Sequence, residues 1–503
     1  MKTLVAAIGV VVLLSGCEAG KMAFSPARKY SPEQLQKDYS VYQTILQESH
    51  PGLYWYTSKD TMDHFLREGA SKLTDSMTEQ QFRLLLTYVT AKINCGHTSV
   101  RPSKKFVRYL DTVRTKVFPL SMKIWGGQPN EDDTMVVALN INRKDSIIKR
   151  GTVIKSINGH SVNQLVDTMI NYISSDGYNR SHKFQSLSNR GYFGSLYTSL
   201  FGQPDKYNIE YLDSSGVVRS TTVSAYDPVS DTSNRAFIRP LFNVPQPSKK
   251  ERKQRQLSSV RQLKIDSVNH TAFMDLNSFG RGYQLKSFFR RSFRTLKKDK
   301  INDLIIDVRG NGGGSVTNST FISRYLVDHR FKIADSLYAI QKRTTYGRYI
   351  QNNFFNRLFI LFFTRKRRDG HFHFGYFERH HFKPKKHAHF NKKVYVLIGG
   401  NSFSATTLFV NAIIKQDNVV VVGEETGGGA YGNTAWLIPD VTLPETKIKF
   451  RLPLFRLVMD KNAPKNGRGV MPEVESKPTI EAVRKGEDFK LDKVISLIKE
   501  EKH

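Results

Sequence analysis

Two short apolar runs, residues 304–308 and 394–398, constrain the fold most strongly, because each is followed at once by a glycine-rich loop. A run of this length, bounded by turn residues, is typical of a strand buried inside a sheet. Strand and helix patterns alternate around the two runs, with strands at 271–276 and 419–422 and helices at 285–296 and 405–414. This alternation predicts an α/β domain.

The loop after the second run carries two serines, Ser402 and Ser404, directly before a predicted helix. At such a strand-to-helix turn a hydroxyl is held clear of the sheet edge, and the positive end of the helix favours the anion formed in nucleophilic attack. A serine before a helix more commonly only caps it. By position alone, each serine is a candidate nucleophile or a cap.

Residues 307–314, which include the end of the first run and the loop after it, are rich in glycine. Glycines let backbone N–H groups approach a substrate closely, and pairs of such groups form oxyanion holes. A nucleotide-binding loop would need a Gly-Lys-Ser/Thr ending or the dinucleotide glycine spacing, and this loop has neither. We therefore predict an oxyanion-binding loop.

A third loop contains His97 between Gly96 and Thr98. A lone histidine is more commonly structural, but a glycine-flanked loop displays its side chain better than an apolar helix face does. His97 is therefore a candidate general base. Cys95 lies two residues away, and neighbouring chain positions rarely meet in attack geometry, so we predict that it is a small buried apolar residue.

Four motifs follow one another along the chain: Asp-x-Arg-x-Asn-x-Gly-Gly at 307–314, Ser-Ala-x-x at 404–407, Val-Val-Gly-Glu-x-Thr-x-Gly at 421–428 and Gly-Val-x-Pro-acid at 469–473. With these motifs the chain resembles the tail-specific, or C-terminal processing, serine peptidases (peptidase family S41). The resemblance implies an α/β fold whose ClpP/crotonase-like core is built of repeated β-β-α units. It also selects Ser404, the serine followed by alanine, as the nucleophile. It implies that the N–H groups of Ala405 and of Gly312 or Gly313 bind the oxyanion, each contributing about 3–4 kcal/mol.

The general base departs from the bacterial pattern of this family. Its bacterial branch uses a lysine in a Phe-Gly-Lys-Gly turn after the third motif, where this chain has Gly-Gly-Gly-Ala at 427–430. The tricorn-like branch uses a histidine in a Gly/Ser-His-Thr loop, which His97 matches. The resemblance therefore implies a Ser–His mechanism, and an imidazole with a pKa near 6.5 suits it at neutral pH.

The residue that orients His97 stays open. The tricorn-like branch places a serine just before the histidine and a glutamate before Gly-Val-x-Pro, where this chain has Gly96 and Asn466. An asparagine can also orient a histidine, as in papain-like enzymes. The candidates for this third member are Asp460, Glu473, Glu424 and Asn466.

Upstream of the core, helix starts at Ser31-Pro32-Glu33 and at a Thr78/Gln81 capping box predict a helical N-terminal domain. Short strands, an Asn158-Gly159 turn and a helix over 162–172 then resemble the peptide-binding PDZ module. The stretch 192–201 is interpreted as an insertion in it. The predicted organisation is a signal peptide at 1–17, a tether at 18–30, the helical domain at 31–112, the PDZ-like domain at 113–228, a basic linker at 229–264, the peptidase core at 265–478 with a basic aromatic insertion at 340–391, and a C-terminal helix within 479–503.

The first residues predict export. Lys2 precedes an apolar run, residues 5–14, that is too short to span a bilayer, and the run ends in Leu-Ser-Gly-Cys17. This ending resembles the bacterial lipobox, so Cys17 is expected to become the lipidated first residue of the mature protein; the alternative is an ordinary cleaved signal peptide. The implied location is extracytoplasmic, anchored by lipid in the bacterial cell envelope (periplasm or outer membrane). Cys95 is the other cysteine, so no disulfide is expected once Cys17 is lipidated.

The formal net charge of +32 favours contact with anionic surfaces, or it simply describes a solvated basic surface. Export argues against nucleic acid as a partner. In the insertion, the apolar and basic stretch 358–368 is predicted to touch the membrane beside the lipid anchor. Six histidines follow it without carboxylate or cysteine partners at the fixed spacing of a metal site, so neither a metal nor another cofactor is expected.

The sequence thus predicts a serine endopeptidase that acts on envelope or partly unfolded proteins and recognises their C-terminal tails. The alternative is a catalytically degenerate scaffold or receptor of the same fold that only binds peptides.

Overall fold

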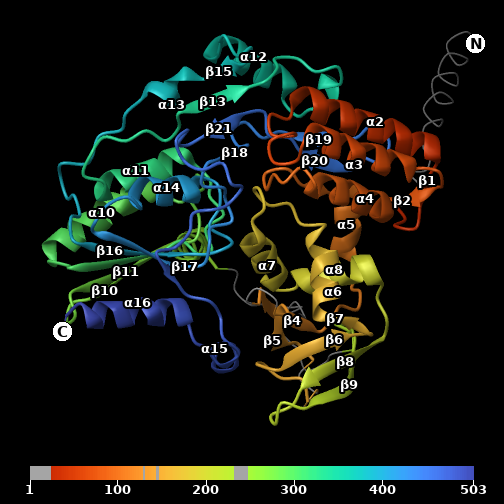
Figure 1. The fold of residues 1–503 in the computed structure, drawn as a ribbon, viewed down its shortest axis with the longest axis horizontal. Helices are drawn as coiled ribbons and strands as arrows, with labels where there is room; N and C mark the ends of the chain where they lie inside the picture. Colours follow the sequence, from red (N-terminus) through yellow and green to blue (C-terminus); the bar gives the residue numbers. More distant parts are fainter. Residues whose placement is uncertain (1–23, 128–130, 143–144, 146, 231–246, 503) are drawn as a thin grey trace, which may run out of the picture.

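The computed structural model describes residues 24–127, 131–142, 145, 147–230 and 247–502, so the predicted signal peptide and Cys17 lie outside the described residues. Figure 1 shows three parts: a helix-covered core sheet, a helical N-terminal part and a module of short strands. Among the described residues, no helix is long and apolar enough to cross a membrane.

The core is a six-stranded sheet in the order β10-β11-β12-β16-β17-β22, in which β10 and β11 are antiparallel and the other neighbours are parallel. Its strands are β10 (Arg261–Asp266), β11 (Thr271–Leu276), β12 (Asp303–Asp307), β16 (Lys393–Ile398), β17 (Val419–Gly423) and β22 (Val474–Glu475). Helices α10 (Leu285–Lys298), α11 (Val316–Leu326) and α14 (Ala405–Ile413) cover one face, and α16 (Phe489–Glu500) covers the other. The predicted α/β order is confirmed.

Burial on both faces explains the two apolar runs. In β12, Leu304 and Ile306 pack into the cluster that contains the helices α10, α11 and α14, while Ile305 packs with Val494 of α16. Parallel strands covered on both sides need apolar residues at every position rather than at alternate ones.

The N-terminal part consists of α2 (Pro32–Ser49), α3 (Lys59–Ser71), α4 (Glu79–Ala91) and α5 (Lys104–Thr112), with a short ladder of β1 (Lys29–Tyr30) and β2 (Met77–Thr78). Both predicted starts are confirmed, because Ser31 and Thr78 each form a capping box with the glutamine three residues on. Helices α2, α3 and α4 share one hydrophobic cluster with buried residues between 334 and 459. In that cluster the ring of Tyr42 lies 5.1 Å from the ring of Phe450.

The module over residues 117–226, called the strand module below, has its own hydrophobic cluster. Its sheet has the order β4-β5-β6-β8-β9, with β7 paired to β6. The elements are β4 (Leu120–Trp125), β5 (Thr134–Asn140), β6 (Val153–Ile157), β7 (His160–Ser161), α6 (Val162–Ile170), α7 (Arg180–Ser188), α8 (Tyr192–Phe201), β8 (Lys206–Leu212) and β9 (Val218–Ser224). The stretch interpreted as an insertion is helix α8, and its residues Phe193 and Tyr197 belong to the cluster of the module.

The expected linker 229–264 holds helix α9 (Lys249–Ser258) and the edge strand β10, while residues 231–246 lie outside the described part. The basic aromatic insertion contributes to a second sheet in the order β14-β15-β13-β21-β18. The strands of this sheet are β13 (Ser336–Ala339), β14 (Arg365–Lys366), β15 (Phe372–His373), β18 (Gly432–Asn433) and β21 (Arg456–Val458). The insertion also contains η1 (Gly347–Tyr349), α12 (Asn353–Phe363) and α13 (Gly375–Arg379). A three-stranded sheet of β19 (Asp440–Thr442), β20 (Lys449–Arg451) and β3 (Val100–Arg101) joins the core to the N-terminal part, and α15 (Ile480–Lys485) precedes α16.

Candidate active site

Ser404 occupies the turn between β16 and α14 with a positive φ of 58° and a ψ of −118°. A non-glycine residue in this conformation carries strain of about 1–3 kcal/mol, which persists only where the surroundings impose it. The side chain of Ser404 is partly exposed and lines a cavity of about 750 Å³. Ser404 does not cap the helix through its side chain.

Ser402, the other candidate, is fully buried. Its Oγ donates a hydrogen bond to the carbonyl of Val308 (2.8 Å) and accepts one from the N–H of Gly399 (3.2 Å). The hydroxyl of Ser402 therefore ties the nucleophile loop to the glycine loop, and Ser404 is the one that faces the cavity.

The glycine loop lies directly against Ser404. A Cβ atom on Gly313 would stand 2.7 Å from the Cβ of Ser404, and its φ is 97°, so this close approach requires glycine. The N–H of Gly313 donates to the side chain of Asn311 (3.0 Å). Within the described residues, the N–H groups of Gly312 and Ala405 make no hydrogen bond, and a Cβ on Gly312 would face open space. Of the three N–H groups predicted to bind the oxyanion, those of Gly312 and Ala405 are thus free to do so.

His97 lies in the loop between α4 and β3, next to the nucleophile loop. Its ring is 5.0 Å from the ring of Phe403, the residue before Ser404, and a Cβ on Gly96 would stand only 2.3 Å from the same ring. Neither ring nitrogen of His97 has a hydrogen-bond partner among the described residues, although the side chain is buried. A second imidazole, His182 of α7, contacts Phe403 from the strand module at 5.1 Å.

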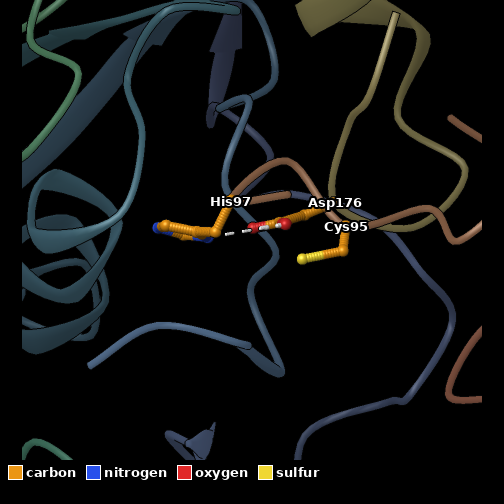
Figure 2. Close-up of side chains that lie close together, drawn as sticks. All are labelled: Cys95, His97 and Asp176. Carbon is orange, nitrogen blue, oxygen red and sulfur yellow. Dashed lines mark ion pairs between the residues drawn. The ribbon is translucent and has the colours of Figure 1, made fainter. Parts of the chain in front are cut away.

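Asp176 is the carboxylate that faces His97. Its Oδ1 lies 3.9 Å from Nδ1 of His97, and Figure 2 shows the carboxylate of Asp176 directed at the His97 side chain. Asp176 belongs to the strand module, between α6 and α7, and is buried. It accepts hydrogen bonds from the N–H of Gly96 (2.9 Å) and of Gly429 (3.3 Å). One carboxylate therefore joins the histidine loop, the strand module and the loop after β17.

Burial shifts the pKa values of both groups toward their neutral forms. It lowers the pKa of His97 to about 3, and the positive charges of Arg451 and His182 act in the same direction. Burial raises the pKa of Asp176 to about 7, although its two backbone hydrogen bonds act against the shift. At pH 7 His97 is therefore a neutral base, and Asp176 changes charge near that pH.

Cys95 completes a buried cluster with these two residues, and single ligand atoms of Cys95, His97 and Asp176 all lie within 4.8 Å of one another (Figure 2). Sulfur, imidazole and carboxylate are all zinc ligands. Burial raises the pKa of the Cys95 thiol to about 11, and its sulfur lies 2.5 Å from the hydroxyl of Thr434. These contacts fit the small buried residue predicted from the sequence.

The four residues predicted from the sequence as candidates for orienting His97 either interact with other residues or are exposed. Glu424 pairs with Lys490 at 2.7 Å, and Asp460 pairs with Lys415 at 3.2 Å. Asn466 accepts a hydrogen bond from the N–H of Arg468, and Glu473 is exposed. None of their described hydrogen bonds or ion pairs reaches His97, whereas Asp176 lies beside it.

The cavity beside Ser404 combines aromatic walls with a few polar groups. Phe359, Phe374, Tyr376, Phe377 and Trp436 line it. Asn433 also lines it, is 2% exposed, and its amide nitrogen and oxygen have no partner among the described residues. Arg451 lines the same cavity, and its charge acts on the pKa of His97, so the cavity and the histidine are neighbours.

Sequence reasoning missed Asp176, His182, Asn433 and Arg451. Asp176 stands in Ser-Ser-Asp-Gly, which has the composition of an ordinary turn. The other three carry no motif, and only the tertiary fold brings them to the site.

Residues 270–476, less than half of the chain, match the family model described as Peptidase family S41. The matched region contains all four motifs, so the resemblance to this family is confirmed for this region. The C-terminal half of the chain thus carries a peptidase S41 domain. No curated protein matches the chain.

Among solved structures, the chain is similar to mature CPAF in complex with lactacystin, with 16% identity and a TM-score of 0.61 over 93% of this chain and 98% of that one. Mature CPAF alone gives the same values, and a mutant of CPAF gives 13% identity and a TM-score of 0.62. At this identity the similarity shows a shared fold across nearly the whole described chain.

Proposed function

We propose that this chain is a serine peptidase in which Ser404 is the nucleophile, His97 the general base and Asp176 the residue that orients the base. The observation that carries the proposal is the strained turn of Ser404, which faces a cavity, lies against the glycine loop at Gly313 and is followed by the free N–H of Ala405. The peptidase S41 domain supplies the reaction class, hydrolysis of a peptide bond.

In the proposed mechanism, Nδ1–H of His97 faces Asp176, which leaves Nε2 as the acceptor. Nε2 takes the proton of the Ser404 hydroxyl while Oγ attacks the peptide carbonyl carbon. The N–H groups of Ala405 and Gly312 stabilise the oxyanion, and His97 then returns the proton to the leaving amine. Water hydrolyses the acyl-enzyme by the same route in reverse.

The base must approach Ser404 for this transfer, because neither nitrogen of His97 is hydrogen-bonded in the free protein. Catalytic hydrogen bonds of free enzymes are commonly long and tighten when substrate binds. The ring of Phe403, the residue before Ser404, packs on the ring of His97, so a shift of Phe403 on substrate binding would also move the histidine.

The substrate is proposed to be a peptide or protein tail. The cavity offers aromatic walls for apolar side chains, and the unpartnered amide of Asn433 fits the alternating donors and acceptors of a peptide backbone. We further propose that the strand module is PDZ-like and presents the tail, and that the core is ClpP/crotonase-like and of the tricorn-like branch. With a lipidated Cys17, the enzyme would act on envelope or partly unfolded proteins outside the cytoplasm.

The second candidate is a peptide-binding scaffold without catalysis. The absence of any described hydrogen bond to the imidazole of His97 favours it over a fully assembled triad. Both candidates use the same cavity, so they differ in whether Ser404 reacts.

A fluorophosphonate probe separates the two candidates. We expect covalent labelling of the wild-type protein, loss of labelling in Ser404→Ala and strongly reduced labelling in His97→Ala. Cys95→Ala and Asn401→Ala serve as matched controls that keep their labelling. An unlabelled wild type, with its fold verified by circular dichroism, would leave the scaffold as the function.

A further inference from the structure

Helix α12 has an apolar side that faces solvent. Phe354 and Phe355 are 66% and 68% exposed, and Leu361 and Phe362 are 52% and 73% exposed. The opposite side is anchored in the protein, where Asn356 and Ile360 are buried. This arrangement inverts the usual helix on a protein surface, which turns its polar side outward.

The apolar side follows the helical period. Its members lie at intervals of one, three and four residues, so they share one side of the helix: Phe354, Phe355, Leu358, Leu361 and Phe362. Contiguous exposed apolar patches are rare on soluble monomers and mark interaction sites. We call these five residues the α12 face.

Positive charge surrounds the α12 face. Arg357 is exposed on the helix itself, and Arg365, Lys366 and Arg368 are exposed just after its end. Nearby Arg367 is already paired with Glu378. Over residues 340–391 the sequence has twelve Lys and Arg against two acidic residues.

We propose that the α12 face and its flanking cations form a docking surface for an anionic lipid bilayer. An interfacial helix buries phenylalanine and leucine at the level of the headgroups while lysine and arginine remain with the phosphates. A second copy of this chain fits less well, because a twofold contact would press the same cations of two chains together. The bilayer offers the opposite charge.

The position of α12 also fits a membrane contact. The helix lies at the upper edge of the molecule in Figure 1, on the outside of the second sheet. Its inner residue Phe359 packs on Phe374 and Phe455 and lines the cavity beside Ser404. Docking would therefore hold one wall of the cavity close to the bilayer. The inference does not depend on peptidase activity.

The test uses the chain from Glu18 onward, so that no acyl chain contributes. Binding is measured by co-sedimentation with phosphatidylcholine vesicles that contain about 30% phosphatidylglycerol, and with pure phosphatidylcholine. The apolar variant combines Phe354→Ser, Phe355→Ser and Phe362→Ser, and the charge variant combines Arg365→Glu, Lys366→Glu and Arg368→Glu.

Two controls change residues elsewhere on the exposed surface, one apolar and at a single site, the other charged and at three sites. One is Val268→Ser, at a valine that is 89% exposed. The other combines Lys249→Glu, Lys250→Glu and Arg252→Glu on helix α9, which has no buried residue. We expect the α12 variants to weaken binding to anionic vesicles at least about tenfold and the controls about twofold or less.

Three results would overturn the proposal: no binding of the wild-type chain to anionic vesicles, an equal loss in the α9 variant, or a dimer in ultracentrifugation that the apolar variant dissolves while vesicle binding is absent. Thermal unfolding verifies that each variant remains folded, and the removal of exposed phenylalanines should not lower the melting temperature.

Discussion

The carboxylate of Asp176 lies 3.9 Å from Nδ1 of His97, although the two residues belong to different parts of the fold. Asp176 also accepts the backbone N–H groups of Gly96 and Gly429. The strand module thus supplies the group that faces the proposed base.

Asp176→Asn should lower kcat about 100-fold with little change in KM, because the orienting charge acts mainly on proton transfer. Activity of the wild type should fall as pH drops through about 7, where Asp176 becomes protonated. The pH profile of kcat/KM should lose this acid limb in Asp176→Asn. Cys95→Ser, in the same cluster, should retain it; an unchanged limb in Asp176→Asn would refute the assignment.

Stability should show two opposite pH dependences at this pair. The pKa of Asp176 is higher in the folded state than in the unfolded chain, where it is near 4. Its contribution to stability is therefore fully present below pH 4 and is lost as the pH rises to about 7. The pKa of His97 is lower in the folded state than in the unfolded chain, where it is near 6.5. The contribution of His97 to stability is therefore fully present above pH 6.5 and is lost as the pH falls toward about 3.

The pH dependences that Asp176 and His97 give to the unfolding free energy have opposite signs and nearly cancel in the wild type. Variants of one residue at a time should therefore reveal them. Between pH 4.5 and 6, Asp176→Asn should gain about 1 kcal/mol of unfolding free energy per pH unit as pH rises, relative to the wild type, and His97→Gln should lose about as much. Urea unfolding at several pH values measures both. Parallel curves for the three proteins would contradict the shifts.

Ser404→Gly should be more stable than Ser404→Ala by about 1 kcal/mol, because glycine adopts the positive φ of this turn without strain. The same pair of substitutions at Ser287, a partly exposed position in the first turn of helix α10, is the control, and there alanine should be the more stable. Equal stability of the two Ser404 variants would mean that the turn is not strained.

Gly313→Ala should destabilise the protein by about 2 kcal/mol, because its Cβ would collide with Ser404 at a positive φ. Gly312→Ala, one residue away, has open space and should change stability by about 0.5 kcal/mol or less. Denaturant unfolding compares the two. Labelling by the fluorophosphonate probe should be lost in Gly313→Ala and kept in Gly312→Ala.

Asn433→Ala should raise stability and lower activity together. It removes a buried amide without partners, which costs the folded state about 1–3 kcal/mol, but it also removes the proposed contacts to substrate. We expect kcat/KM to fall about tenfold, mostly through KM. In the control Asn411→Ala, which loses a hydrogen bond to the carbonyl of Ala430, stability should fall. Unchanged kinetics in Asn433→Ala would remove it from the substrate site.

Local signals account for what the sequence predicted. The apolar runs of β12 and β16 reveal burial on both faces, and the capping boxes of Ser31 and Thr78 place helix starts within a residue or two. The turn before α14 indicates an exposed serine because strand, serine and helix are adjacent in the chain.

Long-range packing accounts for what it could not predict. Asp176 is about 80 residues from His97 in the chain, and no spacing or period links two residues that meet only when modules dock. The apolar run of α12 likewise indicated contact with a membrane but did not say which side of the helix would face out, because both sides are apolar.

The proposed active-site residues belong to two parts of the protein that have separate hydrophobic clusters. The N-terminal helices that precede the His97 loop share a cluster with Leu408 of α14, the helix that follows Ser404, whereas Asp176 is attached to the strand module with its separate cluster. A small tilt of that module would uncouple the carboxylate and leave the nucleophile in place. In the proposed enzyme, the rate of catalysis would then depend on how closely the strand module packs against the rest of the protein.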